Sequence, residues 1–122
     1  MFEVNSLRKG MPFWTKVILS FLNRQELVRQ RLRYIILRCA FKSCGERVTI
    51  KRNVWFVYPE YIEVGDDVLI NNSCFFEGGK GIKIGNHVQF AHCVSIVSMN
   101  HSFDKKDLPI KKQGFTGGPV EL

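Results

Sequence analysis

A chain of 122 residues is long enough for one domain with a core of moderate size, and no apolar run reaches the roughly 18 residues that a membrane span needs. The net charge of +7 is placed unevenly, because residues 1–42 hold nine Lys or Arg against Glu3 and Glu26, whereas residues 43–122 hold nine charges of each sign. This difference predicts a basic N-terminal segment, 1–43, followed by a neutral one, 44–122.

The four cysteines show neither CxxC spacing nor the framework of a disulfide-rich domain; they are Cys39, Cys44, Cys74 and Cys93. This usage predicts reduced thiols in a cytoplasmic protein, with Cys74 and Cys93 as small core residues rather than nucleophiles. The basic segment also allows a cytoplasmic protein that is bound to the inner face of the membrane.

The first predicted element is a helix from Thr15 to about Phe41. Thr15 is of the residue type that caps helices. A second cap between Asn23 and Glu26 would divide the segment, so one helix and two helices both fit the pattern. The apolar residues recur at steps of three and four along it: Leu27/Val28, Leu32, Ile35/Ile36 and Cys39.

Arginines occupy the other faces of this helix, and two interpretations fit them. In the first, the apolar stripe packs on the rest of the domain and the arginines are solvated. In the second, the helix makes contact with an anionic membrane surface, where each cation adds about 1 kcal/mol. Nucleic acid is not an expected partner, because the segment offers charge without a nucleic-acid-binding motif.

Residues 44–103 contain three segments of equal length that align with one another without gaps. Gly45, Gly65 and Gly85 coincide in this alignment, and so do several apolar positions. Repeats in register indicate a solenoid with coils at 44–63, 64–83 and 84–103. The apolar columns are Val48/Val68/Val88, Ile50/Ile70/Phe90, Val54/Cys74/Val94, Phe56/Phe76/Ile96 and Ile62/Ile82.

Within each repeat an apolar residue returns every six positions, as at Ile84, Phe90 and Ile96. Three six-residue units predict a triangular coil, in which each unit supplies one short strand and one corner, and the recurring apolar residue points to the axis. Two extra residues per repeat, near Pro59 and Gly79, fit a bulged corner. The alternative is a twisted β-sandwich, but its strands would alternate with period two throughout, and these segments do not.

The repeat fails at Asn100 and His101, and a polar loop of residues 102–119 follows. A connection of this length is usually functional or disordered. Residues 120–122 (VEL) then restart the motif, because they match residues 62–64 (IEV). Asn100 stands at the fifth position of its unit, where an apolar residue should fill the core, and His101 stands at an outward corner. A functional site is predicted here, because a polar residue takes a position that should contribute to the core.

These segments together resemble the hexapeptide-repeat acyltransferases, in particular the branch that O-acetylates maltose, galactosides and polysaccharides. The resemblance covers about residues 44–122 and rests on the segments VGDDVLINNSCFF, IKIGNHVQFAHCVSIVSMNHSFD and LPIKKQGFTGGPVEL. It implies a mainly β chain folded as a left-handed parallel β-helix, preceded by the helical segment. The handedness comes from the resemblance alone, since crossovers between parallel strands are otherwise right-handed.

The same resemblance implies a homotrimer that transfers acetyl groups from acetyl-CoA to a sugar hydroxyl. The acceptor would be a glycan of surface-polysaccharide synthesis, such as O-antigen or capsule, bound between neighbouring chains. His101 matches the family's general base. A sugar hydroxyl is a poor nucleophile near neutral pH, and an imidazole can accept its proton as it attacks the thioester carbonyl.

Four further residues are candidates for binding. Asn71 matches an acceptor-side asparagine of the galactoside enzymes, and Asn100 adjoins His101, so both are expected to contact the sugar. Asn71 lies on a different face of the coil, so it cooperates with His101 only across a subunit interface; otherwise it is a corner residue with local hydrogen bonds. Lys111 and Lys112 are candidates for the CoA phosphates, although solvated lysines are the alternative.

Other interpretations stay open. One is a non-catalytic β-solenoid that assembles or scaffolds through its trimer faces and basic helix. Another is an inactive fragment, because further coils follow the loop in the resembling enzymes and form much of the CoA pocket, which predicts a longer gene product. His87 and His92 have the spacing of two ligands in γ-class carbonic anhydrases, but the chain has no histidine before His87, so no metal is expected.

Overall fold

The computed structural model describes residues 12–122 and shows one long helix followed by many short strands. Helix α2 spans Phe13–Ala40. Two 3₁₀ helices lie among the strands, η2 (Pro59–Tyr61) and η3 (Ile110–Lys112). The strands are β1 (Ser43–Cys44), β2 (Thr49–Ile50), β3 (Trp55–Val57), β4 (Ile62–Val64), β5 (Leu69–Ile70), β6 (Phe75–Glu77), β7 (Ile82–Ile84), β8 (Gln89–Phe90), β9 (Ser95–Val97), β10 (Met99–His101), β11 (Phe115–Gly117) and β12 (Val120–Glu121).

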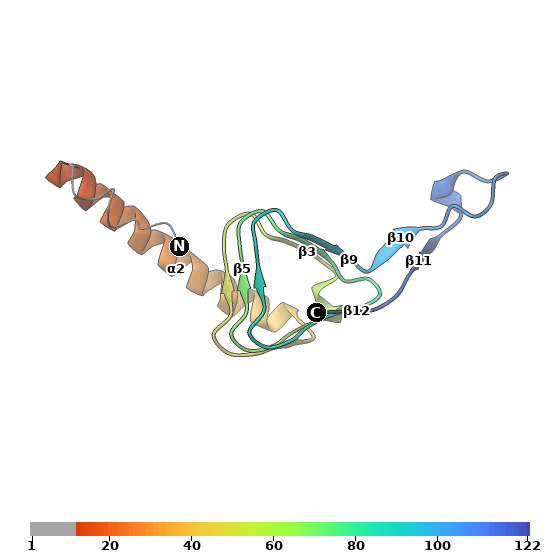
Figure 1. Cartoon of the computed structure of the whole chain (residues 1–122), viewed down its shortest axis with the longest axis horizontal. Coiled ribbons are helices and arrows are strands. Elements are labelled where there is room, and N and C mark those ends of the chain that lie inside the picture. Colours follow the sequence, from red (N-terminus) through yellow and green to blue (C-terminus); the bar gives the residue numbers. More distant parts are fainter. Residues whose placement is uncertain (1–11) are drawn as a thin grey trace.

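Most strands pair in parallel with the equivalent strand of the next repeat, which gives three parallel sheets (Figure 1). Their orders are β1-β4-β7-β12, β2-β5-β8 and β3-β6-β9. Thr49 lies opposite Leu69, and Leu69 lies opposite Gln89, so the repeat length read from the sequence is confirmed. Val120 lies opposite Ile82, which confirms that the motif restarts there. The β-sandwich alternative is wrong, because a β-sandwich is built from antiparallel sheets, whereas these three sheets are parallel.

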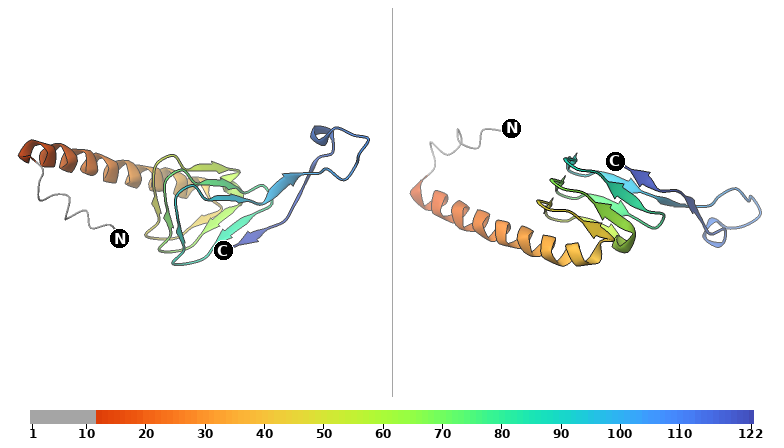
Figure 2. Two further views of the ribbon diagram at one scale, coloured as in Figure 1. Left: turned by 45° about the horizontal axis from the view of Figure 1, so that its top comes forward. Right: turned by 90° about the horizontal axis from the view of Figure 1, so that it is seen from below.

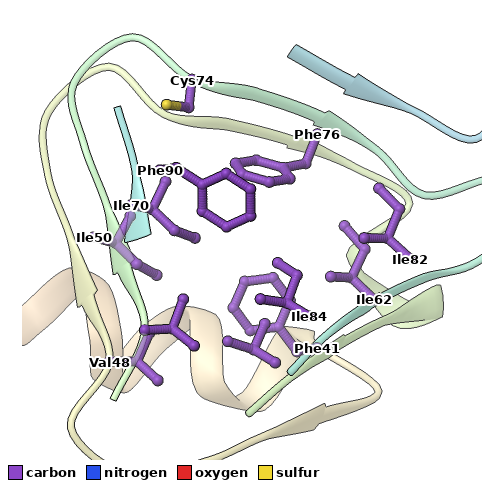
Figure 3. Close-up of a cluster of buried hydrophobic side chains, with 12 residues drawn as sticks. Phe41, Val48, Ile50, Ile62, Ile70, Cys74, Phe76, Ile82, Ile84 and Phe90 are labelled. Carbon is purple, nitrogen blue, oxygen red and sulfur yellow. The ribbon is translucent and has the colours of Figure 1, made fainter. Parts of the chain in front are cut away.

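The apolar columns of the repeat form the core between these sheets (Figure 3). Ile70 and Phe76 have no exposed surface. Four phenyl rings are in contact through the core: Phe56 and Phe76 are stacked, with a centroid distance of 5.2 Å. Phe41 meets Phe56 edge to face at 4.9 Å, and Phe90 meets Phe76 edge to face at 5.1 Å. Each repeat therefore covers the apolar residues of its neighbour, as stacked repeats must do to build a continuous core.

The corners between strands are held by polar and small residues. Asp66 Oδ1 accepts a hydrogen bond from the backbone N–H of Glu46 at 2.7 Å, and Asn86 Oδ1 accepts one from Asp66 at 2.8 Å. These side chains satisfy corner amides that no strand pairs. Left-handed backbone also recurs at equivalent positions of the repeats, at Arg47, Asp67 and His87 and again at Asn53, Ser73 and Cys93.

Helix α2 starts earlier than expected and is continuous. Its N-cap is Pro12, with φ of −55° and ψ of 149°, and no side chain caps the first turn. The prediction that Thr15 caps the helix is wrong, because Thr15 lies inside the first turn and its N–H binds the Pro12 carbonyl at 3.1 Å. The division between Asn23 and Glu26 is wrong as well, since α2 runs through both residues.

Only one face of α2 contacts the strands, and it is not the apolar stripe. Arg33 Nε donates to the Ile50 carbonyl at 3.1 Å, and the Tyr34 hydroxyl donates to the Gly45 carbonyl at 2.9 Å. Leu37 packs on the core. The prediction that the apolar stripe packs on the domain is wrong, because α2 has no buried residue and its stripe is exposed. The C-terminal half of α2 lies against the strands, and the N-terminal half extends beyond them (Figure 2).

The fold is thus mixed helix and strand rather than mainly β, since α2 alone accounts for 28 of residues 12–122. Within these residues, no helix combines the length and the apolar character needed to cross a membrane.

The four cysteines are free thiols. The prediction that Cys74 fills the core is confirmed, because it is fully buried in the second repeat. The same prediction for Cys93 is wrong, because Cys93 is an exposed corner residue with φ of 59°. Cys44 is half-buried, and burial raises the pKa of its thiol, which disfavours a reactive thiolate.

Candidate functional site

An arm of extra residues leaves the strands at one corner of the third repeat (Figures 1 and 2). Val97 lies opposite Glu77, and Val120 lies opposite Ile82. The second repeat thus passes this corner between Glu77 and Ile82, whereas the third needs the much longer stretch from Val97 to Val120. Strands β10 and β11 pair antiparallel within this insertion. Within the expected loop 102–119, residues 115–117 therefore form the returning strand of a hairpin and residues 110–112 form η3.

Glu77 and Ser98 hold the root of the arm. The Glu77 carboxylate accepts hydrogen bonds from the backbone N–H of Gly79 at 2.8 Å and of Met99 at 2.9 Å. The Ser98 hydroxyl, in a residue only 3% exposed, donates to the Glu77 carbonyl and accepts from the Lys80 N–H, both at 2.9 Å. We did not predict either residue from the sequence. Their signal is that a carboxylate ends β6 and a hydroxyl residue directly follows β9, each close to a position that is apolar in the repeat.

Gly117 brings the returning strand close to the root. Its φ is 141°, and a Cβ placed there would lie 2.2 Å from the Ser98 carbonyl oxygen. The N–H of Gly118 then donates to that same oxygen at 3.1 Å. Glycine is needed at position 117 because a side chain would collide with backbone.

His101 lies on this arm, opposite Phe115, in the antiparallel pair. Its ring is exposed and packs on the Phe115 ring with a centroid distance of 4.7 Å and an interplanar angle of 37°. Within residues 12–122, no group hydrogen-bonds to either imidazole nitrogen; only the backbone N–H of His101 is bonded, to Asn100 Oδ1 at 2.8 Å. The imidazole is thus held by an aromatic face with its nitrogens open to a ligand.

The positions predicted for Asn100 and His101 within the repeat are wrong. Asn100 is exposed and pairs with Thr116 of the arm, so it takes no place in the core. The register ends at Val97, and Ser98 and Glu77 direct the chain outward from there. His101 consequently lies in a strand of the arm rather than at a corner of the third repeat.

The outer end of the arm carries Lys111 and Lys112 on η3, where both are exposed (Figure 1). The Gln113 amide closes this end, because it accepts from the Lys105 N–H at 2.9 Å and donates to the Leu108 carbonyl at 2.7 Å. The structure does not bring the two lysines to His101, which lies nearer the root.

Asn71 follows β5, in a different sheet from the arm. Its Oδ1 accepts a hydrogen bond from the backbone N–H of Asn72 at 2.9 Å, which is a local corner contact. Within one chain the structure does not join Asn71 to His101. A role for Asn71 beside His101 stays a prediction that needs a second chain.

His87 belongs to a polar column on one corner. Its Nδ1 lies 3.3 Å from Asp67 Oδ2, and Arg47 donates to the same carboxylate. The Arg47 hydrogen bond holds the pKa of Asp67 below its usual value. His92 is exposed on another corner. Among residues 12–122, no cluster of three or more His, Cys, Asp or Glu side chains is placed to hold a metal ion.

A surface hollow adjoins the root of the arm, and the residues that line it include Tyr61, Lys80, Gly81 and Pro119. His101 does not line it. Its lining combines the Tyr61 phenol with charges of both signs, from Lys42, Lys80 and Lys83 and from Glu63 and Glu121.

No family model, curated protein or solved structure matches this chain.

Proposed function

We propose that this protein transfers an acetyl group from acetyl-CoA to a sugar hydroxyl, with His101 as the general base. The observation that carries the proposal is the placement of His101. Its ring is exposed, supported by Phe115 at 4.7 Å, and unpartnered within residues 12–122 at both nitrogens. It also lies on a hairpin that is inserted where the repeat register ends and fixed there by Ser98 and Glu77.

The fold that we propose for residues 44–122 is a left-handed parallel β-helix, or hexapeptide-repeat solenoid. Three features support it: the common register of the three sheets, the apolar columns between them, and the corners that recur at the same offset. A crystal structure in which the sheets close into left-handed coils is the expected result. Open sheets or right-handed crossovers would contradict this fold.

The proposed reaction needs one proton transfer at His101. The hydroxyl oxygen bonds to the thioester carbonyl carbon while its proton passes to the imidazole. The tetrahedral intermediate then breaks its carbon–sulfur bond, and the CoA sulfur takes the proton from the imidazolium. Backbone N–H groups or side-chain donors must hold the oxyanion. Lys111 and Lys112 are our candidates for the CoA phosphates, and the acceptor is a glycan of surface-polysaccharide synthesis.

We propose a homotrimer as the active form. The arm projects from the strands, so His101 is available to a neighbouring chain (Figure 2). Asn71 and the Asn100 amide are the proposed contacts to the acceptor. Because Asn71 lies in a separate sheet, it would meet His101 only between chains.

The test is CoA release from acetyl-CoA in the presence of a panel of sugars, nucleotide sugars and lipid-linked glycans. His101→Ala should lower the rate about 100-fold or more, which is the usual contribution of a general base. His92→Ala is the matched control, because His92 is exposed and lies on a corner outside the arm. Turnover that is equal in wild type and His101→Ala would refute the role of His101.

A second candidate function is assembly without catalysis. The outer face of the β3-β6-β9 sheet exposes Trp55 and Phe75 side by side, since these residues are register partners. Sedimentation should show trimers that Trp55→Ser and Phe75→Ser dissociate. Trimers together with no CoA release for any acceptor would favour this candidate over acetyl transfer.

A further inference from the structure

One face of α2 is apolar, exposed and continuous along the helix. Its residues follow a spacing of four and three, with Gln25 as the single polar member. Successive residues of a helix are rotated by about 100°, so this spacing places them on one stripe. The most exposed apolar member is Trp14, at 75%, and the other apolar members each exceed 50%. The apolar members are Trp14, Ile18, Phe21, Val28, Leu32 and Ile35.

This face points away from the strands. The contacts of α2 with the strands come from Arg33, Tyr34 and Leu37, which lie on the other side of the helix. The N-terminal half of α2 extends past the strands altogether (Figures 1 and 2). The apolar stripe is therefore exposed, and α2 packs on the strands through its opposite face.

Cations flank the stripe on both sides. On the helical wheel, Arg24 and Arg31 lie along one edge, and Arg29 lies along the other. Neither these three residues nor Lys16 forms an ion pair within residues 12–122. The one acid of α2, Glu26, lies on the docked face, 2.6 Å from Arg33 and 3.2 Å from Arg52. The exposed side of the helix is thus apolar in the middle, and the charged residues along its edges are all cations.

The flanking charges indicate whether a second copy of α2 or a lipid surface covers this face. The four–three spacing also suits a coiled coil with a second copy of α2. In such a pair, however, Arg24, Arg29 and Arg31 would flank the seam on both helices, and like charges would oppose one another. An anionic lipid surface instead offers acyl chains to the stripe and phosphates to both rows of arginines, whose long stems reach the headgroups.

We propose that α2 lies flat on an anionic lipid bilayer, with Trp14, Phe21 and Leu32 inserted at the acyl boundary and the flanking arginines on the headgroups. α2 does not meet the requirements for a membrane span, so the helix rests on the surface rather than crossing it. The docked face then carries the strands on the side away from the lipid. This proposal is independent of acetyl transfer.

The two tryptophans of the chain provide the test. Trp14 lies on the stripe, and Trp55 is comparably exposed, at 64%, on the strand region. Trp55→Phe leaves Trp14 as the sole reporter, and Trp14→Phe leaves Trp55. On titration with vesicles of phosphatidylcholine and phosphatidylglycerol, the emission of Trp14 should shift to shorter wavelength, whereas that of Trp55 should stay unchanged.

Charge and apolar contact are then separated by two further variants made in the Trp55→Phe chain. Arg24→Gln with Arg29→Gln and Arg31→Gln should weaken vesicle binding about 100-fold, since three cations near the surface are removed. Leu32→Ser with Phe21→Ser should also abolish the shift. These side chains are exposed, so circular dichroism should show wild-type folding in both variants.

Three results would overturn the proposal. The first is an unshifted Trp14 emission with anionic vesicles. The second is equal binding to vesicles of phosphatidylcholine alone. The third is a Trp14 shift that appears without lipid and rises with protein concentration together with a doubled mass, which would assign the stripe to a second copy of the chain.

Discussion

The strand region and α2 treat their apolar residues in opposite ways. In the strands, Ile50, Ile62, Ile70 and Phe76 have no exposed surface, because each repeat covers the next. In α2, residues of the same kinds are mostly exposed, and none is buried. Both patterns are periodic in the sequence. The periodicity shows which residues share a face, but it does not show what packs on that face.

This difference assigns separate tasks to the two regions. In the strand region, the corner amides and the strands of one repeat pair with groups of the neighbouring repeat. Helix α2 is held to it through polar contacts such as that of Arg33 with the Ile50 carbonyl. The apolar face of α2 is left for something outside the chain.

The largest expected effect compares the same substitution in both regions. Phe76→Ala should lower the free energy of unfolding by about 3–5 kcal/mol, because Phe76 is fully buried between two other phenyl rings. Phe21→Ala should change it by less than about 0.5 kcal/mol, because Phe21 is 61% exposed on α2. Urea unfolding monitored by circular dichroism measures both. Similar losses in the two variants would show that α2 packs on the chain in solution.

The root of the arm gives the next effect. Gly117→Ala should cost about 1–3 kcal/mol, because the added Cβ would collide with the Ser98 carbonyl at a φ of 141°. Gly118→Ala is the matched control, since nothing lies within 4 Å of its Cβ position. Thermal unfolding of both variants checks the prediction, and equal melting temperatures would contradict the close approach at position 117.

A smaller loss is expected at Ser98. Ser98→Ala removes the hydroxyl that joins the Glu77 carbonyl to the Lys80 N–H, and it should cost about 1 kcal/mol. Ser95→Ala serves as the control, because Ser95 is exposed on β9. Chemical denaturation should separate the two variants. No difference between them would mean that the hydroxyl does not hold the arm.

The smallest effect is a dependence of stability on pH at the corners. Arg47 lowers the pKa of Asp67 in the folded chain, so the unfolded chain binds this proton more readily. The contribution is present above the ordinary carboxyl pKa and is lost as the pH falls through the lowered one. The melting temperature should therefore fall less steeply in acid for Asp67→Asn than for wild type. Asp104→Asn is the matched control, because Asp104 is exposed on the arm and forms no ion pair within residues 12–122.

The sequence predicted the strand register well because the cause of the register is visible in it. Ile50, Ile70 and Phe90 form one column of similar side chains, and parallel strands bury such columns together. The docking of α2 was predicted wrongly because amphipathicity shows that a face is apolar without showing what covers it.

The arm was located only approximately for a related reason. The break was placed at Asn100, slightly too late, because Glu77 and Ser98 direct the chain outward through hydrogen bonds that follow no period. The roles of His101, Asn71, Lys111 and Lys112 stay predictions. Chemistry at a site depends on partners outside this chain, which neither the pattern nor the fold supplies.

Hydrogen–deuterium exchange by region tests the difference between strands and helix most directly. Amides of the strand region should exchange slowly with or without lipid, because their partners lie within the chain. Amides in the N-terminal half of α2 should exchange fast in solution and become protected on vesicles that contain phosphatidylglycerol. Slow exchange in that half of α2 without lipid, or fast exchange with it, would contradict the account.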